Sequence, residues 1–283
     1  MAHKIIALVD GSIYSKSVCE HAAWIAGRTG ASVELMHVLG RREAGSGGDL
    51  SGAIALGART ALLEELTALD EQRAKLTAKR GRAILDDAHA LFGETGIEVH
   101  DHLRHGDLID AITEKETDAD LVLIGKRGEA ADFAKGHLGS NLERVVRAAT
   151  KPLLVASRAF RPVDKVLIAY DSSPSAMRAV NFVARSPLYR GLEITVVTVG
   201  PQTRDADKAL AGAQALLAAD GLSVETTVRP GQPETAISTL IAEQGFDHLV
   251  MGASGHSRLR TLFVGSTSLE MIRTCKVPIL LVR

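Results

Sequence analysis

Residues 4–12 read KIIALVDGS, and residues 165–173 read KVLIAYDSS. Each stretch is a lysine followed by a short apolar run that stops at an aspartate, Asp10 or Asp171, and continues with small residues. An apolar run of this length, bounded by turn-forming residues, predicts a buried strand. An amphipathic helix is expected after each strand, over 15–27 and 175–185. The two stretches therefore predict two copies of one strand–helix unit.

The same order of features continues through both halves. Each aspartate is followed, at the same distance, by a valine that closes a second strand, Val38 or Val199. Three more strands are expected in each half, over 97–103, 121–124 and 152–155, and over 222–228, 248–251 and 278–282. Matched spacing of matched features indicates an internal repeat. Strands that alternate with helices predict an α/β protein of two doubly wound, five-stranded parallel-sheet domains.

The predicted domains cover 1–158 and 162–283, and the first carries a helical insertion at about 41–76. The insertion begins with a glycine-rich stretch, EAGSGGDLSG, and continues with leucines at helical spacing, Leu62, Leu66, Leu69 and Leu76. This pattern predicts one long helix or a helical hairpin. A lid, a dimer contact and simple packing are all open as its role, and we favour packing.

Composition narrows the class of protein. The chain has 283 residues, 46% hydrophobic and 24% charged, with a formal net charge of −1. Because positive and negative charges nearly cancel, the protein has no overall electrostatic field that would attract nucleic acid. The amino terminus does not resemble a signal peptide, and no apolar run reaches the length of a membrane span. The two cysteines, Cys19 and Cys275, have no metal-ligand spacing, so we expect a cytoplasmic protein without disulfides.

The ligand site is expected beyond the carboxyl ends of strands 1 and 4. If the strand order is 3-2-1-4-5, the order reverses between these strands, and ligands bind at such a point. Gly252-Ala-Ser-Gly255 follows the fourth strand of the second half, and Gly265-Ser266-Thr267 opens a helix. Glycines let a ligand approach the backbone, and helix amino termini favour phosphate. Spaced glycines alone would also fit ordinary turns, and the segment is neither a Walker A loop nor the dinucleotide fingerprint.

The spacing Gly252-x2-Gly255-x9-Gly265-Ser266 matches the G-2x-G-9x-G-(S/T) pattern of ATP-binding universal stress proteins. The chain resembles that family over nearly its whole length, apart from the insertion. The resemblance implies the adenine nucleotide α-hydrolase-like fold with strand order 3-2-1-4-5. It also implies that ATP, alone or with Mg²⁺, is held by Asp171, Val199, Gly252, Gly255, Gly265, Ser266 and Thr267.

The first half keeps most of this pattern with one departure. Its corresponding residues are Asp10, Val38, Gly125, Gly128, Gly139 and Ser140, but ten residues rather than nine separate Gly128 from Gly139. We therefore expect the second half to be the better nucleotide site. The resemblance further implies that the two domains pair through their fifth strands, PLLVA and PILLV, and that two chains could associate.

The sequence contains no motif that predicts catalysis or metal binding. His100, His102 and His105 cluster in the stretch HDHLRH, but no further ligand stands at motif spacing, so no metal site is expected. No G-x-S-x-G elbow is present to activate a serine. The leading hypothesis is a cytoplasmic stress-response protein that binds ATP as a binding or signalling event. A non-nucleotide scaffold and a slow phosphohydrolase are the alternatives.

Overall fold

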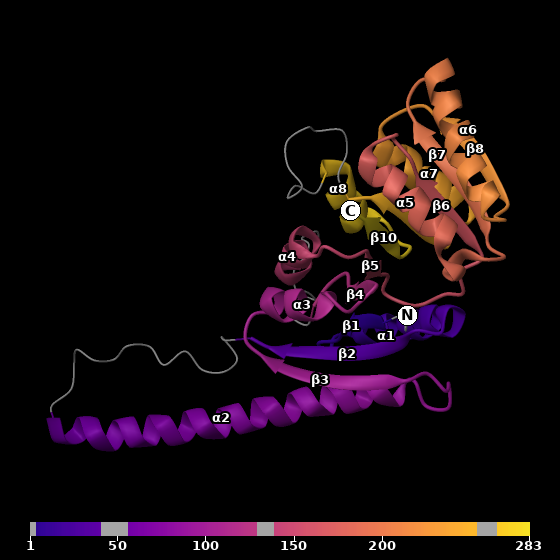
Figure 1. Cartoon of the computed structure of the whole chain (residues 1–283). Coiled ribbons are helices and arrows are strands. Elements are labelled where there is room, and N and C mark those ends of the chain that lie inside the picture. Colours follow the sequence, from indigo (N-terminus) through magenta and orange to yellow (C-terminus); the bar gives the residue numbers. More distant parts are fainter. Residues whose placement is uncertain (1–3, 41–55, 129–138, 254–264) are drawn as a thin grey trace.

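The computed structural model describes residues 4–40, 56–128, 139–253 and 265–283. Their strands form one ten-stranded sheet in the order β3-β2-β1-β4-β5-β10-β9-β6-β7-β8 (Figure 1). Each half contributes five strands in the order 3-2-1-4-5, and all neighbours within a half are parallel. The predicted fold class is therefore confirmed in both halves.

The elements follow the βαβ pattern of the repeat. The first half contains β1 (Lys4–Leu8), α1 (Ile13–Thr29), β2 (Ser32–Leu39), α2 (Leu56–Ala90), β3 (Val99–His105), α3 (Leu108–Glu116), β4 (Leu121–Gly125), α4 (Ser140–Ala148) and β5 (Leu153–Ala156). The second contains β6 (Lys165–Ala169), α5 (Pro174–Arg185), β7 (Glu193–Val199), α6 (Arg204–Ala219), β8 (Val224–Arg229), α7 (Pro233–Gln244), β9 (His248–Gly252), α8 (Ser266–Thr274) and β10 (Ile279–Val282).

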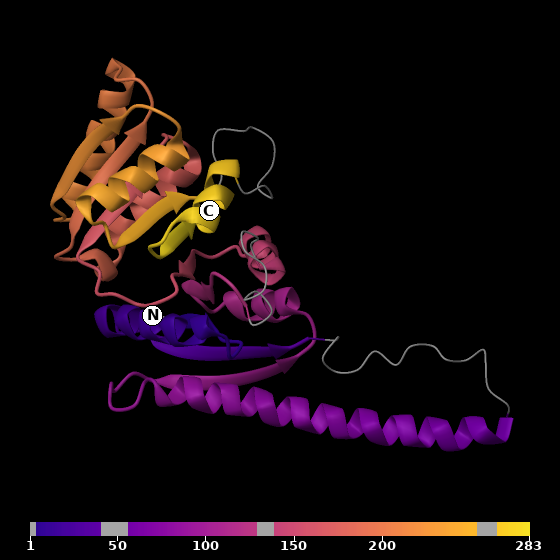
Figure 2. The same ribbon diagram turned by 180° about the vertical axis from the view of Figure 1, so that it is seen from behind.

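Helices cover both faces of the sheet (Figures 1 and 2). In β1, Ile5 and Ala7 belong to one buried cluster, and Ile6 and Leu8 belong to the other. This is the alternation that a strand imposes on its side chains. The first cluster includes side chains of α1, α2, α5 and α6, and the second includes side chains of α3, α4, α7 and α8. Because both faces are covered, the strands are apolar almost throughout.

The two halves meet along an antiparallel strand pair. Ile279 lies opposite Val155 and Leu281 opposite Leu153, which joins β10 to β5. Beside this pair, Phe160 from the interdomain segment packs edge-on against His21 of α1, with ring centroids 5.0 Å apart. The ring centroid of Trp24 lies 6.4 Å from the ring centroids of Phe160 and His248, so aromatic rings from both halves fill this side of the junction.

Residues 56–76 of the predicted insertion belong to helix α2, and residues 41–55 lie outside the described part of the chain. Over the described residues the insertion forms one long helix rather than a hairpin. The carboxyl-terminal part of α2 packs on β2 and β3, where a Cβ at Gly81 would lie 2.7 Å from Leu103 Cδ1. Its amino-terminal part projects away from the sheet (Figure 1). There Leu69 and Leu76 are 55% and 68% exposed, so packing within the chain does not account for them.

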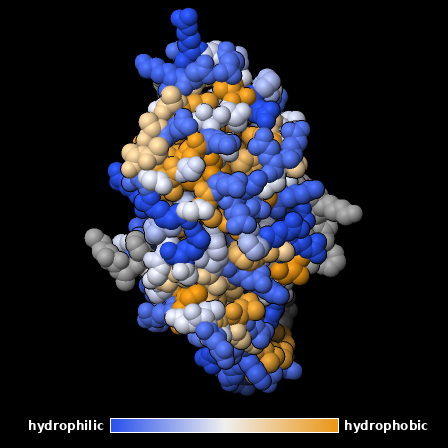
Figure 3. All heavy atoms as spheres, turned by 90° about the vertical axis from the view of Figure 1, so that its right-hand side faces the viewer, coloured by the Kyte–Doolittle hydropathy of each residue, from blue (hydrophilic) through white to orange (hydrophobic). Residues whose placement is uncertain are grey.

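The surface is mainly polar where the structure shows it. Figure 3 presents one face, on which hydrophilic residues predominate and hydrophobic residues gather in small separate groups. Within the described ranges, none of the helices combines the length and apolar character needed to cross a membrane.

Candidate functional site

A cavity of about 310 Å³ opens at the carboxyl ends of β6, β7 and β9. Its volume lies at the lower end of the range of small-molecule sites. The wall contains most of the residues that the sequence singled out in the second half, namely Asp171, Val199, Gly252, Gly265, Ser266 and Thr267. The topological switch point between strands 1 and 4 is therefore hollow in this domain.

The turn after β6 presents Asp171 at the mouth of the cavity. Asp171 is exposed, and its Oδ1 accepts the backbone N–H of Ser173 at 2.9 Å. Ser172, between them, has a φ of 63°, which is unusual for a residue with a side chain. Gly11 holds the equivalent left-handed position in the first half, with a φ of 77°. Such strain tends to occur at functional turns, and here it fixes the aspartate at the strand end.

Gly252 ends β9 and touches the start of helix α5. A Cβ on Gly252 would lie 2.5 Å from Ser175 Oγ and 2.6 Å from the backbone nitrogen of Ala176. The same arrangement occurs in the first half, where a Cβ on Gly125 would lie 2.6 Å from Tyr14 Cβ. Glycine is therefore required at both positions for close packing of helix on strand. Spacing alone suggested a ligand contact and did not reveal this packing role.

We expect Gly252→Ala to destabilise the protein by about 3 kcal/mol, because backbone atoms of α5 cannot move aside for the new methyl group. Urea denaturation should show a lower midpoint with an unchanged slope. Gly212→Ala is the matched control, since its Cβ would meet nothing within 4 Å and alanine favours a helix. Equal midpoints for the two variants would contradict the packing role.

Helix α8 presents its amino terminus to the cavity. Gly265 is its N-cap, and no side chain caps the first turn in the described part of the chain. Free backbone N–H groups at a helix start bind anions. Ser266 is exposed beside them, whereas the Thr267 hydroxyl donates to Glu234 Oε1 at 2.8 Å. Thr267 therefore lines the cavity, but its hydroxyl is hydrogen-bonded to Glu234.

The first half brings its predicted residues together more tightly. A Cβ on Gly128 would lie 2.9 Å from Asp10 Oδ2, and one on Gly139 would lie 3.7 Å from the Gly128 nitrogen. Asp10 Oδ1 also accepts the Ser12 N–H at 3.0 Å and the Ser15 hydroxyl at 3.2 Å. Gly125 ends β4, and Val38 lies near the end of β2. The side chain of Ser140, which opens α4, is outside the described residues.

Two contacts distinguish the first half from the second. Ile84 of α2 lies against Gly11, 3.0 Å from the position of a Cβ. Lys126 could have attracted an anion, but its Nζ donates to the Cys275 carbonyl at 2.7 Å. Burial lowers the pKa of Lys126. This lysine therefore ties the first domain to the second instead of facing a ligand.

A family model described as "Universal stress protein family" matches residues 1–157 and again residues 162–283. The chain belongs to the universal stress protein family. It carries two copies of the family domain in tandem. Universal stress protein Slr1230 of Synechocystis sp. (strain ATCC 27184 / PCC 6803 / Kazusa) is 36% identical over 284 residues, which covers 99% of each chain.

Solved universal stress proteins share the fold along the whole chain. One from Archaeoglobus fulgidus DSM 4304 is 21% identical with a TM-score of 0.76, and the match covers 99% of this chain and 98% of that one. A putative universal stress protein from Pseudomonas aeruginosa UCBPP-PA14 is 15% identical with a TM-score of 0.62, over 99% and 93% of the two chains.

Some positions in this universal stress protein escaped the sequence reasoning, and one predicted residue cannot be placed. Ser268, Pro233 and Ile237 line the cavity, and the Ser268 hydroxyl donates to the Gly252 carbonyl at 3.2 Å. No spacing rule marks them. Gly255 lies outside the described residues.

The histidines on β3 lie beside carboxylates. His100 Nε2 is 3.1 Å from Glu98 Oε1, and His102 Nδ1 is 3.8 Å from Glu34 Oε1.

Proposed function

We propose that this universal stress protein binds ATP or a related adenine nucleotide in the cavity of its second domain. The observation that carries the proposal is that this cavity is lined by six of the seven residues that the sequence pattern selects in this half, all except Gly255. Asp171 would hold the ribose, and Val199 would contact the adenosine. Gly252, Gly265 and Ser266 would meet the phosphates, with Gly255 expected to join them. Mg²⁺ would accompany the phosphates.

The chemistry of the cavity fits such a ligand. Exposed carboxylate oxygens at a strand end accept hydrogen bonds from ribose hydroxyls, as in other nucleotide sites on doubly wound sheets. Apolar side chains of Val199, Ile237 and Met251 line part of the wall and would pack against a base. The start of α8 supplies N–H donors and the positive end of its dipole for phosphate. Thr267 would contribute its backbone N–H while its hydroxyl stays on Glu234.

We propose that binding acts as a signal in a cytoplasmic stress response, without efficient turnover. No lysine of the Walker type is present in the sequence. The test is to denature the purified protein and separate the released small molecules by anion exchange. Adenine nucleotide released from the protein supports the proposal. A scaffold would release none and would show no thermal shift with ATP, whereas a phosphohydrolase would release phosphate at a rate that one side-chain change abolishes.

We propose that the pairing of β5 with β10 also joins the domains in solution. The pairing covers two edge strands, LLVA and ILLV, which would otherwise expose unpaired backbone groups. Two side chains add hydrogen bonds across the junction. Lys126 donates to the Cys275 carbonyl, and Arg283 Nη2 donates to the Arg147 carbonyl at 2.7 Å.

We further propose that two chains associate through helix α2. Leu62, Leu69 and Leu76 recur every seventh residue on its exposed part. Residues 64–71 carry four acidic side chains, and residues 73–82 carry five basic ones, with no opposite charge in either segment. Antiparallel pairing of two copies would therefore set acidic segments against basic ones and bury the leucines.

We expect Leu69→Glu to convert a dimer to a monomer, as measured by light scattering during gel filtration. Each copy would bury a carboxylate among the leucines of the other copy, which is strongly unfavourable. Leu91→Glu is the control, because Leu91 is 43% exposed but lies beyond the end of α2. A monomeric wild-type chain, or a Leu69→Glu dimer, would contradict this pairing.

A further inference from the structure

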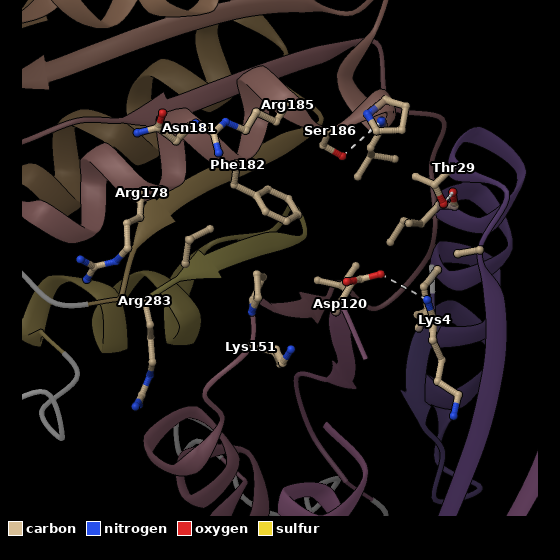
Figure 4. A pocket seen from close by; sticks show the side chains of 18 residues that line it. Lys4, Thr29, Asp120, Lys151, Arg178, Asn181, Phe182, Arg185, Ser186 and Arg283 are labelled. Atoms are coloured by element: carbon tan, nitrogen blue, oxygen red, sulfur yellow. Dashed lines mark hydrogen bonds between the residues drawn. The ribbon is translucent and has the colours of Figure 1, made fainter. Parts of the chain in front are cut away.

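A second and larger cavity, of about 510 Å³, lies at the junction of the two domains. We call it the seam cavity. It is bounded by Lys4 at the start of β1, by Ile25 and Thr29 of α1, and by the face of α5 from Arg178 to Arg185 (Figure 4). None of these residues lines the cavity at the carboxyl ends of β6, β7 and β9, where we propose that the nucleotide binds. The seam cavity is therefore a separate space.

The inner wall of the seam cavity is apolar. Ile25 and Leu121 come from the first domain, and Phe182 and Leu188 come from the second. Figure 4 shows Phe182 projecting from α5 into the space between the domains. An apolar wall of this kind, with few polar groups, is typical of sites for small organic molecules.

Cations outnumber acids around this wall. Five basic residues line the cavity and one acidic residue, Asp120, accompanies them; the basic residues are Lys4, Lys151, Arg178, Arg185 and Arg283. Two of them have other partners, because Lys4 Nζ is 2.7 Å from Glu34 Oε2 and Arg283 donates to backbone carbonyls. For Lys151, Arg178 and Arg185, no ion pair occurs within the described ranges. Asp120 accepts the Lys4 backbone N–H at 3.4 Å.

The internal repeat shows that the fold does not need this cavity. In the register that aligns Asp10 with Asp171, His21 and Trp24 of α1 correspond to Phe182 and Arg185 of α5. On the α1 side of the junction, aromatic rings pack the equivalent place, with Phe160 and His248 against His21 and Trp24. On the α5 side the tryptophan is replaced by an arginine, and a cavity lined by further cations is found instead.

We propose that the seam cavity binds a small amphipathic anion, an acyl chain or aromatic body with one carboxylate or phosphate head. The body would pack on Ile25, Leu121, Phe182 and Leu188, where burial of apolar surface supplies the affinity. The head would lie among Lys151, Arg178 and Arg185, for which the described residues provide no ion-pair partner. This site is independent of the nucleotide proposal, since the two cavities share no residue.

Isothermal titration of the full chain with decanoate, decyl phosphate and decanol tests the proposal. We expect one saturable site for an anion, and at least about tenfold weaker binding of decanol, which lacks the charge. The stronger of the two anions identifies the head group. The affinity for the anion should fall as salt rises, because the cations lie near the surface.

Variants place the site. Lys151→Gln combined with Arg185→Gln should weaken anion binding about tenfold or more, and Asn181→Trp should abolish it by filling the cavity. Lys208→Gln, an exposed change on α6 outside the cavity, should leave it unchanged. Unfolding midpoints close to wild type show that each variant is folded. Equal affinity for decanol and decanoate, no saturable binding, or insensitivity to Asn181→Trp would overturn the proposal.

Discussion

Val199→Trp should lower the affinity for ATP more than about 100-fold while the chain remains folded. Val199 ends β7 and is half-buried in the wall of the second-domain cavity. An indole at this position would occupy a large part of the about 310 Å³ available. The new side chain would extend into open space, so the core strands would not have to move. Equilibrium titration with ATP measures the affinity, and thermal unfolding shows that the fold persists.

The internal repeat provides the matched control for this variant. Val38 is also half-buried, and it occupies the same position in the first domain. Val38→Trp should leave the affinity for ATP within about twofold of wild type if the second domain holds the nucleotide. A loss of binding with Val38→Trp and none with Val199→Trp would move the nucleotide to the first domain. It would contradict the assignment based on the nine-residue spacing.

Acidification should destabilise the protein well above the range in which carboxylates titrate. Burial lowers the pKa of His248 from 6.5 to about 3, with a further decrease from the nearby His21. Burial lowers the pKa of His21 to about 4. Both histidines are fully buried, one in each domain, in the aromatic cluster at the junction. The folded protein keeps them neutral, whereas the unfolded chain takes up protons below pH 6.5.

The unfolded state therefore binds more protons as the pH falls below 6.5. The stabilisation is complete above that pH and is lost towards the folded pKa values of about 4 and about 3. We expect the free energy of unfolding to fall by roughly 3–5 kcal/mol between pH 7 and pH 4.5. Urea denaturation at several pH values measures this loss. Glu34 and Asp107, whose pKa values the folded state lowers, add their own loss only at lower pH.

Single substitutions assign this dependence to the junction. His21→Phe and His248→Phe should each reduce the slope of stability against pH by up to about 1.4 kcal/mol per pH unit, which corresponds to one proton. His100→Gln, an exposed change on β3, should leave the slope as it is in the wild-type chain. A wild-type stability that stays constant between pH 7 and pH 4.5 would show that these histidines are not buried at the junction.

The sequence predicted the architecture because each level of pattern agreed with the others. Apolar runs that end at Asp10 and Asp171 specify strands buried on both faces, and equal spacing to Val38 and Val199 specifies the repeat. The third strand of the first half begins at Val99 rather than at 97. This strand lies at the sheet edge and is only partly buried, so its hydrophobic pattern is weak.

Features that depend on contacts between distant residues could not be read from the sequence. Gly252 was selected as a ligand contact, but its packing against Ser175 depends on how α5 lies across β9. The bond from Lys126 to Cys275 depends on the domain junction. The engagement of Thr267 with Glu234 joins two helices that are far apart in sequence. The leucine pattern indicated a helix for the insertion but not whether the chain itself would cover it.

The central claim is that the cavity between Asp171 and the start of α8 holds an adenine nucleotide. Isothermal titration of the wild-type chain with ATP tests it most directly. We predict saturable binding that Val199→Trp removes, together with a rise in the unfolding temperature as ATP is added. If millimolar ATP produces neither heat nor a shift in unfolding temperature, the second domain does not hold a nucleotide there.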